Sequence, residues 1–192
     1  YNKINDNSTI SGGLRYFSLG EITFTDNLGN DIKTYSPNEF SLDMGYGMKF
    51  NNNLSGGIAM RYIYSNLTGG QQVGSIETQA GQAFAIDLGT YYESSIDENN
   101  QWAIGMNISN IGTKISYTQE MDEDFLPMNM KLGGRYSMNI DDYNRFSVAL
   151  DINKLLVPTP PLYEAGTDSI TSGQDDNVSV VQGIFQSFGD AP

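Results

Sequence analysis

Seven charged side chains recur at positions where an extended strand would place them on one face together with glycine and alanine. In an enclosed space such side chains can pair with one another, or the cations among them can line a path for an anion or a substrate. Because buried charges need partners, we expect Arg61, Lys131 and Arg135 to pair with aspartates of the same face. The seven residues, which we predict to face a barrel lumen, are Asp43, Lys49, Arg61, Asp87, Lys131, Arg135 and Asp151.

Catalytic chemistry is not indicated. The chain contains no histidine and no cysteine, which removes the commonest general base and the usual zinc ligands. Its serines and aspartates show no spacing typical of a nucleophile with a base and an orienting group. We therefore predict that the protein is not an enzyme, that it has no catalytic residue, and that it uses no cofactor or metal.

An acidic run between two of the expected strands offers oxygen ligands that could hold calcium. It lacks the regular spacing and the turn glycine of a calcium-binding loop, so a solvated loop is the favoured interpretation. The run consists of Glu120, Asp122, Glu123 and Asp124.

Charge and hydropathy narrow the classes of protein further. The formal net charge of -13 argues against a nucleic-acid partner, because phosphate binding needs clustered lysine and arginine. The mean hydropathy is -0.37, and the sequence has no run of about 18 apolar residues that could cross a bilayer as a helix. Any membrane span must therefore be a strand, in which only every second residue needs to be apolar.

Alternation with a period of two is the dominant pattern. From Phe40 to Phe50 every second residue is large and apolar, whereas Asp43, Gly45 and Gly47 lie between them. A helical period of 3.6 would mix the two sets, so the pattern predicts a strand. The expected strands cover residues 39–50, 54–65, 83–93, 101–110, 126–140 and 145–155, with a less regular one near 14–24.

The connections between these strands alternate in length. Residues 51–53, 96–100 and 141–144 form short connections, and the intervening ones are long. This rhythm is typical of an antiparallel up-and-down transmembrane β-barrel, with short periplasmic turns and longer external loops. It places the segment from residue 157 onward outside the cell.

Alternation alone also fits a soluble β-sandwich or a lipocalin-like barrel. The face opposite the apolar one favours the membrane barrel, because it is rich in glycine and alanine, which are poor strand formers without a packing reason. A narrow lumen supplies such a reason. A soluble binding module remains an alternative.

The segment after the last strand contains a candidate partner surface. It begins with three prolines, and residues 178–188 could form a short helix. Exposed apolar groups on an otherwise acidic exterior suggest contact with protein, although packing back over the barrel mouth is an equal alternative. The candidate residues are Leu155, Leu156, Val157, Ile184, Phe185 and Phe188.

Several strings resemble the PorV family of the type IX secretion system of Bacteroidetes. The most specific elements are NKLLVPTPP at residues 153–161 and QSFGDAP at residues 186–192, because alternation alone would not generate them. The other strings are YSPNEFSLDMGYGMKF, LSGGIAMRYIYSNL and LPMNMKLGGRYSM.

The resemblance implies a FadL-like outer-membrane barrel of about fourteen strands. Residues 1–192 would then be an internal piece of one barrel domain, with about seven strands and both ends missing. The implied function is to receive secreted cargo bearing a C-terminal signal domain at a SprA/Sov-like outer-membrane translocon, and to shuttle it to a sortase attachment complex. The barrel would also contact membrane lipid. A FadL-like channel for hydrophobic small molecules is the alternative function.

Overall fold

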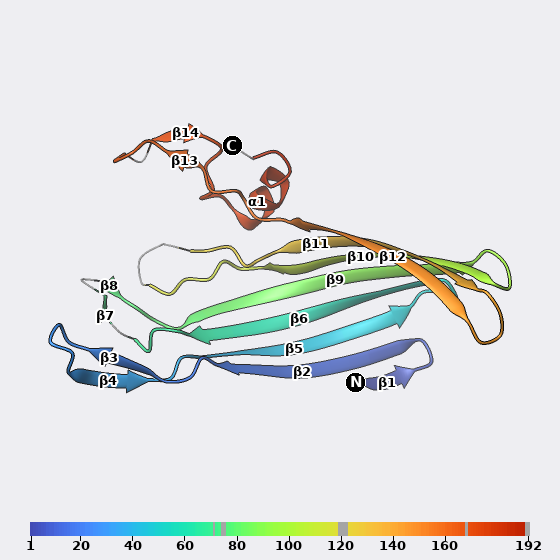
Figure 1. Cartoon of the computed structure of the whole chain (residues 1–192), viewed down its shortest axis with the longest axis horizontal. Helices are drawn as coiled ribbons and strands as arrows, with labels where there is room; N and C mark the ends of the chain where they lie inside the picture. Colours follow the sequence, from blue (N-terminus) through green and yellow to red (C-terminus); the bar gives the residue numbers. More distant parts are fainter. Residues whose placement is uncertain (71, 74–75, 119–122, 168, 191–192) are drawn as a thin grey trace.

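One antiparallel sheet dominates the structure, a computed structural model that describes residues 1–192 except 71, 74–75, 119–122, 168 and 191–192. Its eight strands follow one another in sequence order and reverse direction at each step (Figure 1). The prediction of an all-β, antiparallel, up-and-down fold is confirmed. The strands are β1 (Asn2–Asn5), β2 (Ser8–Ser18), β5 (Asn38–Lys49), β6 (Leu54–Asn66), β9 (Gly81–Ser95), β10 (Asn100–Gly112), β11 (Asn129–Asn139) and β12 (Arg145–Leu155).

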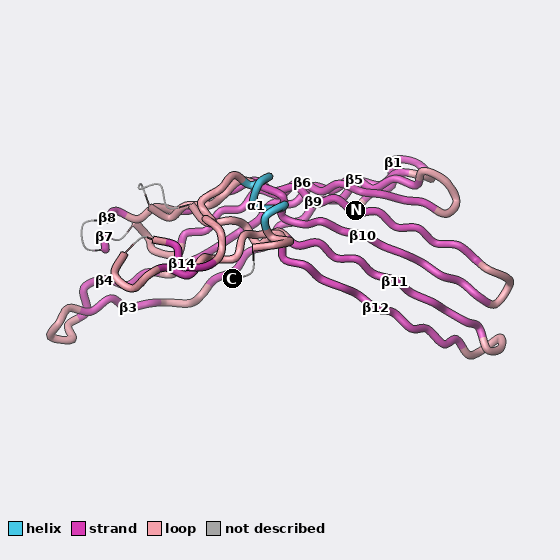
Figure 2. The backbone as a smooth tube through the Cα atoms, turned by 90° about the horizontal axis from the view of Figure 1, so that it is seen from above, coloured by secondary structure: helices cyan, strands magenta, loops and turns pink. Residues whose placement is uncertain are grey.

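The sheet is curved, and within the described residues it does not close on itself. Figure 2 shows β12 lying well away from the plane of β5 and β6. The short strand β1 forms one edge and β12 forms the other, and these two strands are not paired with each other. A closed barrel is therefore not part of the observed fold.

The first predicted strand, near residues 14–24, was placed wrongly. The sheet strand here is β2, which ends at Ser18, and Gly20 then adopts a φ of 85°. Glycine readily adopts this left-handed backbone conformation, and the chain leaves the sheet at this point. The prediction also missed the four-residue strand β1.

Three of the long connections form two-stranded antiparallel ribbons. These ribbons lie at one end of the sheet, opposite the short turns (Figure 1). Helix α1 (Val180–Gln186) begins after Ser179, whose hydroxyl accepts the N–H of Gln182 at 3.3 Å. No helix in the described part of the chain is long and apolar enough to cross a bilayer. The ribbons are β3 (Ile22–Thr25) with β4 (Asp31–Tyr35), β7 (Gln72–Val73) with β8 (Ile76–Glu77), and β13 (Leu162–Tyr163) with β14 (Ile170–Ser172).

The same pattern of hydrogen bonds closes two of the short turns. In the turn between β11 and β12, Asp141 Oδ1 accepts the backbone N–H groups of Tyr143 and Asn144 at 2.8 Å each. Asn144 Nδ2 also donates to both carboxylate oxygens at 2.9 Å. Asp97 and Asn100 repeat this arrangement between β9 and β10. In both turns the hydrogen bond from the asparagine side chain, followed by the backbone N–H bonds, lowers the pKa of the aspartate.

We expect Asp141→Asn to give a small loss of thermal stability at neutral pH that disappears in acid. The pKa of Asp141 in the folded chain is lowered from 3.8, so the carboxylate stabilises the turn above the ordinary carboxyl pKa. This contribution is lost as the pH falls through the lowered pKa. The melting temperatures of the parent and the variant, measured from pH 7 to pH 2, should converge at the acidic end. A constant difference across this range would contradict the account.

Candidate functional site

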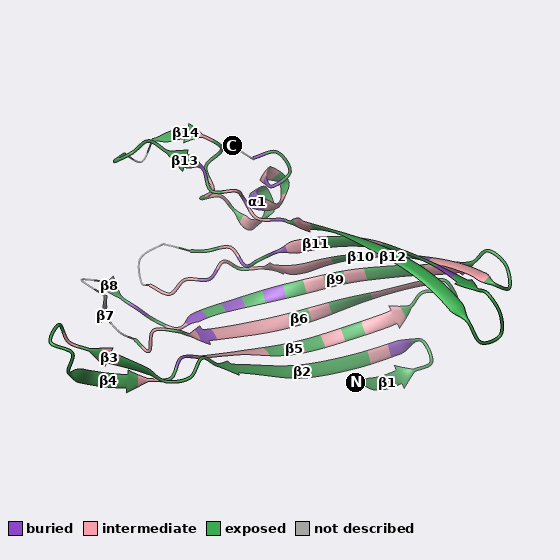
Figure 3. Cartoon of the chain, in the orientation of Figure 1, coloured by how far each residue is buried: buried purple, intermediate pink, exposed green. Residues whose placement is uncertain are grey.

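Alternating residues of the strands divide the sheet into two chemically different faces. On the outer face, large apolar side chains are exposed, among them Met44 at 73% and Leu150 at 70% exposed. On the inner face, Ala85 and Ala103 are 2% and 3% exposed. Figure 3 shows the contrast between the exposed strand β12 and the buried residues of β9. The inner face, where charged side chains lie among small residues, is therefore the candidate site.

Arg61 of β6 is the centre of a charged cluster on this face. Its Nε lies 2.5 Å from Asp43 Oδ1 of β5, and its Nη2 lies 3.2 Å from Asp87 Oδ2 of β9. The three side chains are only 18–19% exposed. The cluster extends to Arg15 of β2, whose Nη2 is 3.4 Å from Asp43, although this arginine is 71% exposed. Ion pairs thus link the four neighbouring strands β2, β5, β6 and β9.

The strand register brings these groups together. Asp43 and Arg61 are direct cross-strand partners in the β5–β6 pair, and Asp87 pairs with Ala59, two residues before Arg61. Opposite charges at direct or diagonal positions on one face of a sheet attract each other. A register shift of one residue would move these side chains to the outer face.

A β-bulge adds a fifth strand to the cluster. The pairing of β10 with β9 shifts between Ile108 and Ile111, and Asn110 within this bulge has a φ of 60°. Its backbone N–H donates to Asp87 Oδ1 at 2.7 Å, and its Oδ1 accepts from Arg61 Nη1 at 2.5 Å. Bulges re-aim side chains in this way, and asparagine tolerates the left-handed backbone better than most residues. The bulge therefore provides a neutral partner for Arg61.

A second, more exposed ion pair lies nearer the short turns. Arg135 Nη2 of β11 is 2.5 Å from Glu93 Oε2 of β9 and also donates to Tyr91 Oη at 3.2 Å. Tyr91 in turn donates to Glu93 Oε2 at 2.7 Å. The partner of Arg135 is therefore a glutamate and not the aspartate that we expected from the sequence.

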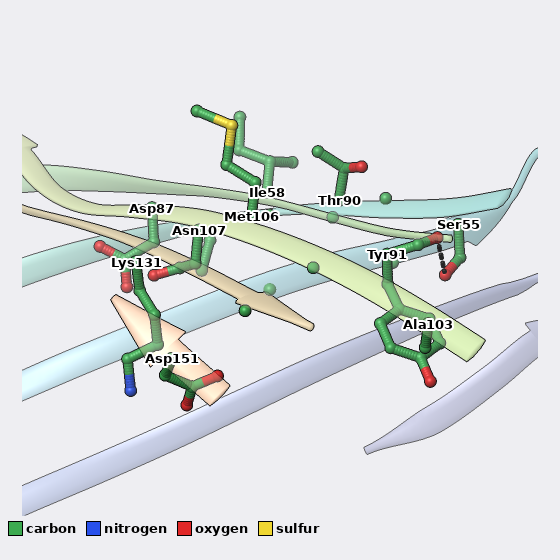
Figure 4. A pocket seen from close by; sticks show the side chains of 18 of the residues that line it. Ser55, Ile58, Asp87, Thr90, Tyr91, Ala103, Met106, Asn107, Lys131 and Asp151 are labelled. Carbon is green, nitrogen blue, oxygen red and sulfur yellow. Dashed lines mark hydrogen bonds between the residues drawn. The ribbon is translucent and has the colours of Figure 1, made fainter. Parts of the chain in front are cut away.

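Between the two charged groups lies an open trough of about 710 Å³, floored by glycines of five strands. Lys131 and Asp151 line it and point to the same side of the sheet, away from Met106 and Ile58 (Figure 4). Neither residue, nor Lys49, forms an ion pair within 4.0 Å among the described residues, so the expected pairing of Lys131 is not seen. In the described part of the chain no group of three acidic side chains lies close enough to hold a metal. The trough is lined by glycine backbone, by charged side chains and by neutral polar side chains such as Asn107 and Tyr91.

The segment after β12 is held against the loop end of the sheet by polar contacts. Lys154 Nζ donates to the carbonyl of Ser187 at 2.5 Å and lies 5.4 Å from the ring centroid of Phe188. Asp190, which is 3% exposed, accepts from the backbone N–H of Thr159 at 2.6 Å and from its hydroxyl at 3.1 Å. Lys154 of β12 thus binds the end of α1 to the sheet, and the contacts between Asp190 and Thr159 hold the two ends of the segment together.

The candidate partner surface is only partly exposed. Phe185 is 74%, Phe188 59% and Leu155 52% exposed, whereas Val157 and Ile184 are half-buried. Leu156 requires a correction, because it is 2% exposed and its backbone N–H donates to the carbonyl of Met128. Leu156 is thus packed inside, whereas Phe185, Phe188 and Leu155 face outward, and the role of this surface in contacting protein stays a prediction.

Half of the acidic run lies outside the described residues, namely Glu120 and Asp122. The other two members, Glu123 and Asp124, are described, and Asp124 pairs through its backbone with Ile115, at 2.9 and 2.8 Å. The interpretation of this run as a solvated loop stays a prediction.

Sequence reasoning missed four groups that take part in the charged clusters, namely Arg15, Tyr91, Glu93 and Asn110. Tyr91 and Glu93 follow Asp87 and Gly89 in the alternation of the expected strand 83–93, so the signal that places them on this face was present in the sequence. Asn110 could not be found in this way, because the bulge reverses the face on which it points.

These features define a class of all-β proteins, built from one antiparallel meander with an apolar face, a charge-bearing face and the long connections at one end. Over residues 1–162 the chain matches the family described as Type IX secretion system protein PorV. The chain therefore belongs to the PorV family, as the resemblance of its sequence strings indicated, and it is a type IX secretion component. No curated protein matches it. The matched range ends before QSFGDAP, so the significance of that element stays a prediction.

Proposed function

We propose that this chain forms part of the wall of a closed outer-membrane β-barrel in Bacteroidetes, with about fourteen strands in the whole barrel. The barrel receives secreted cargo through the cargo's C-terminal domain beside a SprA/Sov-like translocon, and carries it to the sortase attachment complex. It acts by binding and has no catalytic role. The membership of the PorV family is the observation that carries this proposal.

The outer face supports the location in a membrane. Large apolar side chains are exposed along the strands, including Leu14 at 67%, Met60 at 60% and Phe84 at 64%. A water-soluble protein rarely leaves so extended an apolar surface uncovered, whereas acyl chains solvate it favourably. The unpaired edges of the sheet also suit a larger wall, because a barrel leaves no strand edge open in lipid.

The surface around α1 supports a role in binding protein. Val181 and Phe185 are one helical turn apart and are 65% and 74% exposed, and Phe188 follows at 59%. Exposed aromatic side chains are typical anchors of protein interfaces. This apolar patch lies on the segment that follows β12, at the end of the sheet where the long connections gather (Figure 1).

A photoreactive amino acid at Phe185 of the full-length protein should crosslink to cargo or translocon in secreting cells. Phe185 is preferable to Ile184, which is half-buried. The matched control is Tyr143, which is 95% exposed in a short turn at the opposite end. The crosslinked products are identified by mass spectrometry. Equal capture from both positions, or capture of neither cargo nor translocon at Phe185, would contradict the proposed surface.

The trough favours a second candidate, a channel for hydrophobic small molecules. Its glycine floor leaves about 710 Å³ open along the inner face. The charged cluster around Arg61 fits an acyl chain poorly, because burying paired charges against hydrocarbon is unfavourable. Normal fatty-acid uptake in a deletion strain would exclude this candidate.

A further inference from the structure

The two sequence elements that strand alternation does not explain lie in contact with each other. NKLLVPTPP covers residues 153–161, and the described part of QSFGDAP covers residues 186–190, so residues 162–185 separate them in the chain. Helix α1, which leads into the second element, lies beside the end of β12, from which the first element continues (Figure 1). We call the contacts between residues 153–161 and residues 183–190 the motif interface.

Polar groups of the first element bind groups of the second. Lys154 Nζ donates to the backbone carbonyl of Ser187 and lies 5.4 Å from the ring centroid of Phe188. Thr159 donates to the carboxylate of Asp190 twice, through its backbone N–H at 2.6 Å and through its hydroxyl at 3.1 Å. Both ends of the first element thus bind the second element.

The motif interface is buried. Asp190 and Ser187 are 3% and 5% exposed, and Pro158 is buried as well. A Cβ atom at Gly183 of α1 would lie 3.0 Å from Pro158 Cγ, so the lack of a side chain there lets the helix lie close to the proline. Buried polar groups destabilise a structure unless they are hydrogen-bonded. The bonds across the interface supply these partners, and removing one side leaves the other unsatisfied.

Helix α1 depends on such contacts for its conformation. It has seven residues, including Gly183 in its interior, whereas isolated helices shorter than about 12 residues are unstable in water. Glycine lowers helix stability further. The helix has no acidic residue in its first turn and no basic residue in its last turn, so its own charges do not compensate the helix dipole. The motif interface therefore fixes where α1 lies and which side chains it exposes.

The exposed side chains of α1 are apolar. Val181 and Phe185 lie one helical turn apart and are largely exposed, whereas Gly183 is buried against Pro158. A surface that is held in its binding conformation loses less conformational entropy when a partner binds. Holding two apolar side chains in fixed positions therefore suits a binding surface.

The charge of this part of the chain indicates the kind of partner. Residues 155–190 contain no lysine or arginine, and they contain five acidic residues. Complementary charges at the rim of an interface favour the correct partner. The fitting partner is a protein that offers an apolar pocket bordered by lysine or arginine. The acidic residues are Glu164, Asp168, Asp175, Asp176 and Asp190.

We propose that the motif interface fixes α1 in the orientation in which Val181 and Phe185 enter such a pocket. Lys154, Thr159 and Asp190 are then positioning residues, which act through α1. This inference rests on the proposed function, which assigns partner binding to the surface around α1. It also gives QSFGDAP a role, because Asp190 belongs to that element.

Photocrosslinking in secreting cells tests the positioning residues. In the full-length protein with a photoreactive amino acid at Phe185, Asp190→Ala and Lys154→Met should each lower capture by about fivefold or more, because α1 then spends less time in the binding orientation. Lys154→Arg keeps a cation and a donor and should retain most of the capture. The matched control is Glu164→Ala, which removes an exposed carboxylate of the same segment. Heat-modifiable gel mobility shows that each variant is folded.

A disulfide should replace the lost hydrogen bonds. The 192 residues contain no cysteine, and positions joined by a hydrogen bond, such as 159 and 190, lie within the range of a disulfide. Thr159→Cys combined with Asp190→Cys should therefore lose capture at Phe185 when reduced and regain it when oxidised. Capture that does not respond to oxidation would contradict the positioning role.

A spin label at Val181 reports on α1 without any partner. Its motion should be restricted in the parent protein and Glu164→Ala, and faster in Asp190→Ala. Unchanged motion in Asp190→Ala, or faster motion with undiminished capture, would overturn the inference. So would a captured peptide without lysine or arginine beside its apolar residues. Failure of the parent protein to capture any partner contradicts the proposed function instead, and the spin label still shows whether the motif interface holds α1.

Discussion

Arg61→Met should destabilise the full-length protein by about 2–3 kcal/mol, one of the two largest effects expected for a single substitution here. The change leaves Asp43 and Asp87 close together without a cation between them, and it removes the donor to Asn110. Removing one partner of a fully buried ion pair costs about 3–5 kcal/mol. We expect a smaller value because these side chains are 18–19% exposed and water screens them in part. Urea unfolding in lipid vesicles, followed by heat-modifiable gel mobility, measures the effect.

Two comparisons separate the lost pairing from a general loss of packing. Arg135→Met should cost less than about 1 kcal/mol, because Arg135 and Glu93 are 42% and 41% exposed. Adding Asp43→Asn and Asp87→Asn to Arg61→Met should recover part of the stability, since the charge that the cluster then leaves unpaired, Arg15, is 71% exposed and solvated. If the triple variant is less stable than Arg61→Met alone, the cluster does not act as an ion-pair network.

Leu150→Arg should cost about 2–4 kcal/mol, because the substitution places a charge among acyl chains on the outer face of the wall. Leu150 is 70% exposed. If that face met water, an exposed leucine could be replaced at a cost within about 0.5 kcal/mol. The same unfolding measurement therefore distinguishes a lipid-facing surface from a solvent-facing one.

The control for this prediction is the neighbouring inner-face position. Ala149 lines the trough, so Ala149→Arg should be tolerated better than Leu150→Arg. Spin labels at Met44 and Leu150 give a second readout, and both should be accessible to oxygen dissolved in the bilayer and shielded from a water-soluble relaxant. The opposite accessibility, together with a neutral Leu150→Arg, would rule out the membrane wall.

The strands from residue 39 onward could be predicted from the sequence because alternation is a local property. Each of the expected segments overlaps a strand of the sheet, and Asp43, Arg61 and Asp87 share the face assigned to them. The first strand could not be located in this way, because Gly20 takes the chain out of the sheet in the middle of the expected segment. Leu156 has an apolar side chain in the connection after β12, and only its packing shows that it is buried.

Residue order by itself determined the fold class, the two faces of the sheet and the PorV family, because period-two alternation and short motifs are readable along the chain. Only the tertiary structure decided which charges meet. Arg61 pairs with Asp43 and Asp87 through strand register, and with Asn110 through a bulge that reverses the local alternation. The packing of the connection between β10 and β11 on the inner face could not be predicted either, because it depends on a contact between Ile115 and Ala83, which are far apart in sequence. Contacts of this kind arise from the shape of the assembled wall, which local patterns do not encode.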